Sequence, residues 1–459
     1  MTESTDALAP TQGKPKLKFF SYRLGWAVGA AGPNLMNTLQ SSVVLFYLTN
    51  VLSIDVGMAG VLLFISKLYD MAINPIVGVV SDRTKSRLGR RRPYLAAGGI
   101  LAALAVLLMF NIPASLSETL RIALVLGVML LYSTSYTLFI VPFLAMPGEM
   151  ALGYDERSKL MAMRNVFAST GLFMAMVVAP ALIALPGEQT NAFRILGVVM
   201  SIFVGVTMLT AFFTTAGAQL AETAGERKRA TLKESLAALW GNRPFLALVG
   251  AKFFGVVGTV VSSGGSLFFI TQVMQQSTRW ASVYGLAVIG ANVLSMPFWL
   301  WVSKRLTKKI TLIIATLGVG LMNMSWLLAS PEEGIEFFVF RGLLSGVAAG
   351  GVLVTLFAML PDTMEYDRER FGLRREGLFA GVFALSEKLA YTTVALLIAS
   401  ILASAGFVKG LPPGQLQSPQ VIDTLYFIKG VLAPSANLLS VVCVLLYFLK
   451  PTSREAPQS

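Results

Sequence analysis

Long, mostly apolar stretches follow one another along almost the whole of this chain of 459 residues. A helix that crosses a lipid bilayer needs about 20 consecutive, predominantly apolar residues. We identify twelve stretches that meet this length, so the sequence predicts an all-α membrane protein with twelve transmembrane helices. They cover roughly 24–50, 57–80, 94–112, 120–147, 165–186, 192–215, 245–273, 281–302, 310–330, 336–360, 377–405 and 420–449.

The composition excludes most catalytic chemistry. Charged residues make up 13% of the chain, against about 25% in soluble globular proteins. There is no histidine, which excludes histidine-based triads, zinc motifs and proton relays. Cys443 is the one cysteine, so neither an internal disulfide nor a CxxC site can form. We therefore expect no enzyme, no metal site and no cofactor other than a transported ion.

The spacing of the stretches divides the chain into two halves. The largest polar insertion, 217–244, follows the sixth stretch and is interpreted as a cytoplasmic interdomain loop. Residues 1–13 lack an apolar core, so no cleavable signal peptide is expected. The predicted segments are a disordered tail (1–18), a six-helix bundle (19–216), the loop (217–244), a second six-helix bundle (245–450) and a tail (451–459).

Basic residues indicate the orientation. Most of the 37 lysine and arginine residues fall in alternate loops and near both termini, which the positive-inside rule assigns to the cytoplasm. The formal net charge of +13 is then a topology signal, and we expect no nucleic-acid partner. The sequence predicts a multi-pass, monomeric protein of the cytoplasmic (inner) membrane, with both termini in the cytoplasm.

A basic turn recurs after the second stretch of each half. The first copy places Gly78, Asp82, Arg83 and Gly89 ahead of an arginine run, and the second is the segment 303–309. This repeat resembles the major facilitator superfamily, whose two halves rock about a central site. A loop that only anchors the orientation would explain the basic residues, but not the two glycines and the aspartate.

Three further segments narrow the resemblance. They are 69–94, 136–169 and 359–388, of which the third, with Asp367, Arg374, Arg375, Glu376 and Gly377, is the most specific. Over about 22–450 the chain resembles the glycoside–pentoside–hexuronide:cation symporter family. The resemblance implies symport of a sugar-like solute (a glycoside, oligosaccharide, pentoside or hexuronide) with H⁺ or Na⁺, by alternating access.

Two other functions stay open at this stage. The broader family includes carriers of lysolipids, so the same fold carrying an amphipathic or other non-sugar solute is the first alternative. A membrane protein that does not transport, such as a sensor, is the second. In each case the expected partners are the lipid bilayer and a small molecule, and a coupling cation is expected for transport.

One face of the second stretch is a candidate cation site. Lys67, Asp70 and Asn74 are spaced by three and four residues and so share a helical face. Pro75 cannot donate a backbone hydrogen bond, which leaves a nearby carbonyl free. The resemblance implies cation binding by Asp70, Asn74 and Thr137, although the family has a carboxylate where this chain has Asn74. Alternatively, Lys67 and Asp70 form a structural ion pair.

The identity of the cation depends on that replacement. A site with one carboxylate has less negative charge to hold Na⁺. Burial also disfavours the charged form of a carboxylate and so favours a bound proton. We therefore favour H⁺ and leave Na⁺ as the alternative.

Two charged residues lie side by side in the eleventh stretch. Adjacent helical residues point about 100° apart, so at most one of Glu387 and Lys388 faces a central cavity squarely. The resemblance implies that Lys388 couples the two halves and lies near the solute, and we expect it to reach Asp70. The alternative is a pair such as Glu387 with Lys252 that only holds helices together.

A polar stripe on the first stretch is a candidate solute site. Asn34, Asn37, Thr38 and Ser41 are spaced so that they share one helical face, and such a stripe in a bilayer faces protein or water. We expect Asn34, Asn37 and Ser41 to offer hydrogen bonds to a polyol. Alternatively, the two asparagines bond only to a neighbouring helix.

Other candidate solute contacts lie on the fourth and fifth stretches. Tyr136 and Phe143 offer stacking surfaces, unless they serve only in packing. The resemblance implies that Arg164 lies beside the sugar and the cation, although an arginine near a helix end also extends to the membrane surface. The family's galactoside ligands are replaced at Asn34, Ile140 and Leu144, so we do not expect a galactoside such as melibiose.

Loops on the predicted cytoplasmic side mix charges of both signs. Exposed ion pairs are individually weak, which suits a gate that opens in every cycle. We expect pairs between the halves to close this face, although charged loops are also common without any gating role. The candidate gating residues are Asp82, Arg83, Arg157, Asp362 and Arg374.

Overall fold

A computed structural model describes residues 16–147, 154–217, 239–371, 376–411 and 414–448. Over these ranges the chain is helical and contains no strand. Eleven helices are long and apolar enough to cross a membrane, and they coincide with the second to twelfth predicted stretches. Most of the predicted interdomain loop lies outside the described residues.

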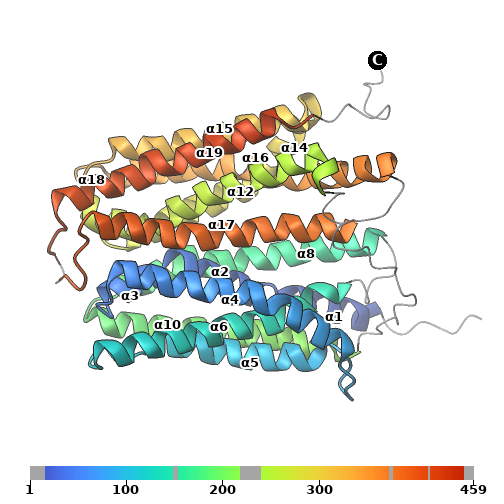
Figure 1. Cartoon of the computed structure of the whole chain (residues 1–459), viewed down its shortest axis with the longest axis horizontal. Coiled ribbons are helices and arrows are strands. Elements are labelled where there is room, and N and C mark those ends of the chain that lie inside the picture. The colour runs from blue at the N-terminus through green and yellow to red at the C-terminus, as the bar shows by residue number, and fades with distance from the viewer. Residues whose placement is uncertain (1–15, 148–153, 218–238, 372–375, 412–413, 449–459) are drawn as a thin grey trace, which may run out of the picture.

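The N-terminal half consists of helices that run nearly parallel in Figure 1. They are α1 (Lys16–Val28), α2 (Ala31–Ser42), α3 (Val44–Asn50), α4 (Val56–Arg83), α5 (Arg92–Met109), α6 (Glu118–Ala145), α8 (Tyr154–Phe173), α9 (Ala179–Ile183) and α10 (Gln189–Thr214). A π-helical turn, Met174–Val178, joins α8 to α9.

The C-terminal half repeats this arrangement. Its helices are α12 (Arg243–Gly264), α13 (Ser266–Phe268), α14 (Arg279–Arg305), α15 (Lys308–Met324), α16 (Ile335–Phe371), α17 (Glu376–Ser404), α18 (Pro419–Phe427) and α19 (Ala433–Leu445). Two π-helical turns, Phe269–Val273 and Ile428–Leu432, continue α13 and join α18 to α19.

The first predicted stretch is not one straight helix. It is divided among α1, α2 and α3, none of which alone is long enough to cross a membrane. Pro33 has no N–H to donate to the carbonyl of Gly29, so one helical hydrogen bond is missing here. At the same break the N–H groups of Gly29 and Ala30 donate to the carbonyls of Trp26 and Ala27, three residues back. The twelfth crossing therefore stays a prediction.

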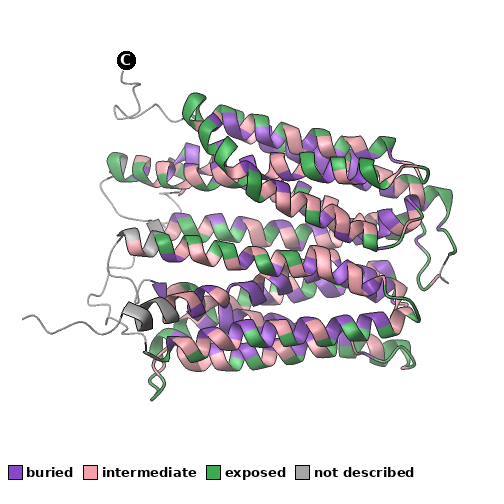
Figure 2. Ribbon diagram, turned by 180° about the vertical axis from the view of Figure 1, so that it is seen from behind, coloured by how far each residue is buried: buried purple, intermediate pink, exposed green. Residues whose placement is uncertain are grey.

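The outer surface of the bundles suits a lipid environment. Figure 2 shows exposed residues on the outward faces of the helices and buried ones between them. Leu294 and Leu328 are 82% and 80% exposed. Exposed apolar side chains of this kind are unfavourable in water and favourable in hydrocarbon. The outward faces of the helices therefore suit contact with lipid.

One of the contacts between the halves runs along α4 and α17, which lie side by side at the centre of Figure 1, and another joins α14 to α9 and to the π-helical turn Met174–Val178. Gly60 of α4 is essential to this close approach, because a Cβ there would lie 2.2 Å from the Cβ of Ala399 on α17. At the same end of the molecule, Lys409 pairs with Glu118 at 2.7 Å, and the amide of Gly410 donates to the carbonyl of Thr49. The halves are thus in direct contact at the end that was predicted to face outside.

Candidate functional site

The carboxylate of Asp70 is the centre of a buried polar cluster. Asp70 lies midway along α4 and is 5% exposed. Its Oδ2 is 2.8 Å from Nζ of Lys388 on α17. Its Oδ1 accepts hydrogen bonds from Oγ1 of Thr137 on α6 at 2.6 Å and from the amide of Asn74 at 3.3 Å. The predicted contact between Lys388 and Asp70 is therefore present, and it joins the two halves.

The local sequence of α4 explains this arrangement. Asp70 and Asn74 are one turn apart, so the Asn74 amide reaches both the carboxylate and the backbone carbonyl of Asp70. Pro75 lies inside a helix that stays continuous to Arg83. A proline at this position leaves the carbonyl of Met71 without its usual helical donor. The expected free carbonyl beside the Asp70 cluster stays a prediction.

A second ion pair involves Glu387, the residue that precedes Lys388 in α17. Glu387 pairs with Lys252 of α12 at 2.8 Å. Lys252 is 4% exposed, donates to the carbonyl of Phe383 at 2.9 Å and lies 3.9 Å from the centre of the Phe383 ring. The contact named in the alternative for Glu387 is therefore present, while its purely structural role stays a prediction; the neighbouring Lys388 points to the other half.

Lys67 does not pair with Asp70 in the way that the structural alternative expected. Its ammonium donates to Oδ1 of Asn37 on α2 at 3.0 Å and lies 5.7 Å from the ring centre of Tyr391 on α17. No ion pair of Lys67 is present among the residues that the structure describes. Asn37, predicted as a solute ligand, is thus held by a lysine at the interface between the halves.

Of the other predicted solute residues, Tyr136 lies at the central cluster, whereas the contacts of Arg164, Asn34 and Ser41 are local to their own helices. The ring of Tyr136 lies 5.9 Å from Nζ of Lys388 and so belongs to the central cluster. Arg164 is half-buried on α8 and donates to Asn165 at 3.3 Å. Asn34 and Ser41 are partly buried on α2; the Asn34 carbonyl accepts from Thr38, and the Ser41 hydroxyl donates to the Thr38 carbonyl.

Phe143 lies apart from this cluster. It is fully buried, and its ring stacks on Trp26 of α1 with 4.5 Å between ring centres. The indole of Trp26 also donates to the Phe143 carbonyl at 3.1 Å. Both residues belong to the N-terminal half, so this placement gives Phe143 a packing contact, which was the alternative named for it.

Two of the predicted gating residues, Asp82 and Asp362, form pairs inside their own halves. Asp82 lies 3.2 Å from Arg91, and Asp362 lies 2.8 Å from Lys308. Arg83 is exposed at the end of α4. The side chains of Arg157 and Arg374 lie outside the described residues. A gating role for this set stays a prediction. The ion pair between the halves that lies near a membrane surface, Glu118 with Lys409, is at the opposite end.

A cavity of about 550 Å³ lies beside the charged cluster. Lys252 and Glu387 both line it, which places it next to that ion pair, whereas neither Asp70 nor Lys388 is among its lining residues. Much of its wall comes from α12, where hydroxyl residues face it. Our interpretation of the sequence did not single out these residues, although they stand out as polar positions in the apolar stretch 245–273. The hydroxyl residues of α12 that line the cavity are Thr259, Ser262 and Ser263.

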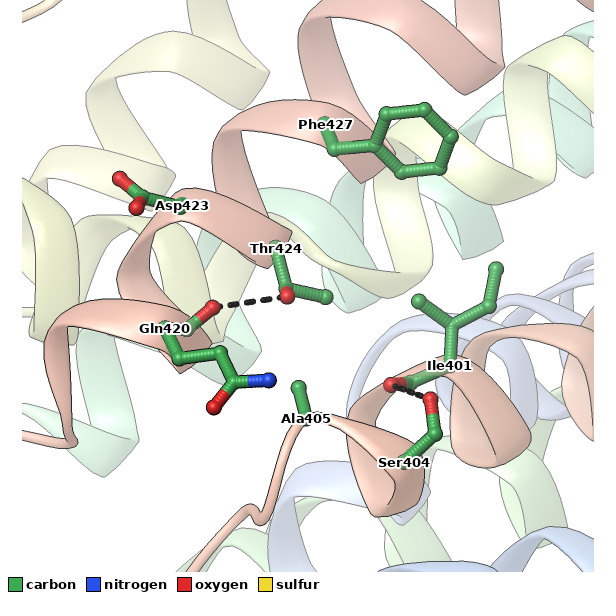
Figure 3. Close-up of a pocket in the computed structure, with 7 residues that line it drawn as sticks. All are labelled: Ile401, Ser404, Ala405, Gln420, Asp423, Thr424 and Phe427. Atoms are coloured by element: carbon green, nitrogen blue, oxygen red, sulfur yellow. Dashed lines mark hydrogen bonds between the residues drawn. The ribbon is translucent and has the colours of Figure 1, made fainter.

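A second hollow lies on the surface near the end of α17. Figure 3 shows its residues on α17, α18 and the segment that follows α17. Two of its polar side chains are satisfied within their own helices, since Thr424 donates to the Gln420 carbonyl and Ser404 to that of Ile401. It has no buried charge aimed into it, so we place the functional site at the central cavity.

The sequence is similar to those of known membrane transporters. The family model described as MFS/sugar transport protein matches residues 25–454. The isoprimeverose transporter of Lactiplantibacillus pentosus is 22% identical over 93% of this chain and 88% of its own. The glucuronide carrier protein homolog of Escherichia coli (strain K12) is 22% identical over 92% of this chain and 91% of its own.

Solved structures support the fold. A bacterial homolog of the human lysosomal transporter Spinster, crystallised in an inward-facing and unoccupied conformation, superposes with a TM-score of 0.66 and 13% identity, covering 95% of this chain and 97% of that one. A point mutant of the nucleoside transporter NupG gives a TM-score of 0.63 and 13% identity, covering 95% and 100%. At these identities the likeness concerns the fold alone.

Proposed function

This chain belongs to the MFS/sugar transport protein family, and on that premise we propose that it couples the uptake of a sugar-like solute to the entry of a cation. Members of this family are multi-pass membrane transporters and not enzymes. We further propose twelve crossings with both termini in the cytoplasm, a place in the cytoplasmic membrane, and function as a monomer.

The ion pair between Asp70 and Lys388 is the observation that supports coupling. It joins α4 of one half to α17 of the other, in a setting where only 5% of Asp70 is exposed. A cation that binds to Asp70 competes with the ammonium of Lys388 for the same oxygens. Cation entry therefore releases a contact between the halves, and their relative movement becomes dependent on the ion.

The proton is the cation that we favour. Asp70 is the only carboxylate of this cluster on α4, and its Oδ1 already accepts from Thr137 and Asn74. Protonation removes the charge that holds Lys388 and needs no further oxygen ligands. Na⁺ has to gather several oxygen ligands, and the amide of Asn74 currently directs its N–H, not its oxygen, at the carboxylate.

The solute class is supported by the named relatives and by the cavity. Those relatives include a transporter of isoprimeverose and a homolog of a glucuronide carrier protein, and both names refer to saccharide solutes. A volume of about 550 Å³ falls in the range of small-molecule sites, about 300–1,000 Å³. The hydroxyl residues of α12 offer the hydrogen bonds that a polyol requires. The alternative solute class, an amphipathic molecule such as a lysolipid, is favoured by the apolar residues that line the rest of the cavity.

Uptake by the purified, full-length protein in sealed liposomes tests the proposal. Labelled pentosides, neutral disaccharides, glucuronides and lysophosphatidylcholine are supplied outside, with either an inward proton gradient or an inward Na⁺ gradient. We expect a saccharide to accumulate with the proton gradient and a protonophore to abolish accumulation. Accumulation that ignores both gradients contradicts coupling, and strong Na⁺ stimulation at constant pH contradicts the proton preference.

A further inference from the structure

The central cavity has two walls of opposite chemistry. On one side α12 presents a row of hydroxyl residues that ends at Ser266, the first residue of α13. Most of the side chains that α14 and α16 contribute are apolar, with Tyr284, Asn292 and Ser345 as the polar ones. The apolar wall includes Val288, Ile289, Val293, Met296, Val352 and Leu353. A sugar that offers only hydroxyls matches the first wall and not the second.

The hydroxyls of the polar wall are oriented by the helix that carries them. Thr259 donates to the carbonyl of Gly255 at 3.0 Å, and Ser266 donates to the carbonyl of Ser262 at 2.6 Å. A hydroxyl that has used its proton in this way still offers an acceptor lone pair. The row spans about 10 Å along the helix axis, at 1.5 Å per residue. This wall therefore suits the hydroxyl donors of a saccharide.

A buried lysine supports the far end of the polar wall. Lys429, in the π-helical turn before α19, is 2% exposed and lies 4.5 Å from the ring centre of Trp326. Its ammonium donates to Oγ of Ser266 at 2.7 Å and to the carbonyl of Ser262 at 3.3 Å. The Ser262 hydroxyl in turn donates to Asn323 at 2.9 Å. Ser262 and Ser266 are thus held by hydrogen bonds to Lys429, which does not line the cavity, and to Asn323, which does.

The apolar wall leaves hydrophobic side chains uncovered. Val293 and Leu353 line the cavity and are 49% and 44% exposed. The next residue, Leu294, is 82% exposed and does not line the cavity. Apolar surface that faces an open cavity is stabilised when an apolar group covers it. A sugar without an apolar substituent would therefore leave the apolar surface of α14 and α16 uncovered.

We propose that the transported solute is a glycoside with an apolar aglycone, whose sugar hydroxyls bind along α12 and whose aglycone packs against α14 and α16. This inference rests on the proposed transport of a sugar-like solute and specifies its class. It assigns Val293 and Met296 to the aglycone, and Ser262 and Ser266 to the sugar.

Equilibrium binding to the full-length protein tests the solute class. Methyl and phenyl β-glycosides are compared in pairs that share a sugar: glucose, galactose, xylose and glucuronic acid. For at least one sugar we expect the phenyl glycoside to bind at least about tenfold more tightly than its methyl partner, because the ring covers apolar surface. No phenyl preference for any of the four sugars, including no binding by either member, overturns the inference.

Neighbouring variants locate the aglycone. Val293→Asn should weaken binding of the phenyl glycoside at least about fivefold more than that of its methyl partner, whereas Leu294→Asn should alter neither. Ser262→Ala should weaken both glycosides alike. If Val293→Asn weakens both equally, or Leu294→Asn removes the preference, the assignment of the walls is wrong.

These measurements do not depend on ion coupling. Binding is measured with no gradient, so a phenyl preference together with uptake that ignores both ion gradients would contradict coupling while supporting the solute class. Coupled accumulation of a saccharide without any phenyl preference would support coupling and contradict the proposed solute class.

Discussion

The ammonium of Lys388 lies 2.8 Å from the carboxylate of Asp70, although 318 residues separate the two in the chain. The contact links α17 to α4 and therefore links the two halves of the molecule. Thr137 and Asn74 occupy the other carboxylate oxygen. A cation that reaches Asp70 competes with these three partners for the carboxylate, and Lys388 is the one that belongs to the opposite half.

Asp70→Asn should abolish accumulation of the solute. An amide cannot take up a proton or hold a cation by charge, so the ratio of inside to outside solute should fall to about 1. Exchange of labelled for unlabelled solute should continue, because the sugar site is assigned to α12. The measurement is uptake and exchange in liposomes. Asp423→Asn, which alters an exposed residue of α18, is the matched control, and accumulation that survives in Asp70→Asn contradicts the assignment.

Lys388→Met should destabilise the protein more than the double variant Asp70→Asn, Lys388→Met. Removing one partner of a fully buried ion pair costs about 3–5 kcal/mol, since the other charge is left uncompensated. The cost should be smaller here because the Lys388 side chain keeps 30% exposure. Thermal unfolding in detergent measures the difference. Equal or greater loss in the double variant would show that the two charges do not depend on one another.

Asn74→Asp should shift coupling towards Na⁺. A second carboxylate one turn from Asp70 adds negative charge and oxygen ligands beside the carbonyl that Pro75 releases. We expect Na⁺ to stimulate uptake severalfold at constant pH in the variant and to have little effect on the wild type. Asn74→Gln, which keeps the amide, is the control. An unchanged response to Na⁺ in Asn74→Asp would remove Asn74 from the cation site.

Features that depend on one helix were predictable from the sequence. The length of each apolar stretch predicted eleven of the observed helices, because a bilayer demands that length. The shared face of Asp70 and Asn74 follows from helical spacing. The divergence of Glu387 and Lys388 follows in the same way, and their partners in the structure are in different halves.

Helical spacing alone did not predict contacts between distant helices, and the contact of Lys388 with Asp70 was expected from the family resemblance. Asn37 is held by Lys67 from another helix, and Phe143 is covered by Trp26. Neither contact can be derived from the spacing of residues along one segment. The walls of the cavity are also set by how α12, α14 and α16 pack. Lys429 stood out as a charge within an apolar stretch, but nothing near it in the sequence indicates Ser266 as its partner.

Gly60→Trp should trap the two halves apart at the end where they now meet. A Cβ at Gly60 would already lie 2.2 Å from the Cβ of Ala399, so an indole ring cannot fit between α4 and α17 in this arrangement. Alternating access requires this end to close and open in every cycle. We therefore expect uptake to fall at least about tenfold, while the protein still folds and binds solute, because the opposite arrangement of the halves leaves room for the ring.

Spin labels at positions 118 and 409 make this trapping visible. In a Cys443→Ser background, Glu118→Cys and Lys409→Cys place the two labels where an ion pair now spans 2.7 Å between the halves. Their separation should lengthen in Gly60→Trp. Gly127→Trp is the matched control, because a Cβ at Gly127 meets nothing within 4 Å, and it should transport normally with unchanged label distance. If Gly60→Trp behaves like this control, the contact between α4 and α17 does not close the transport path.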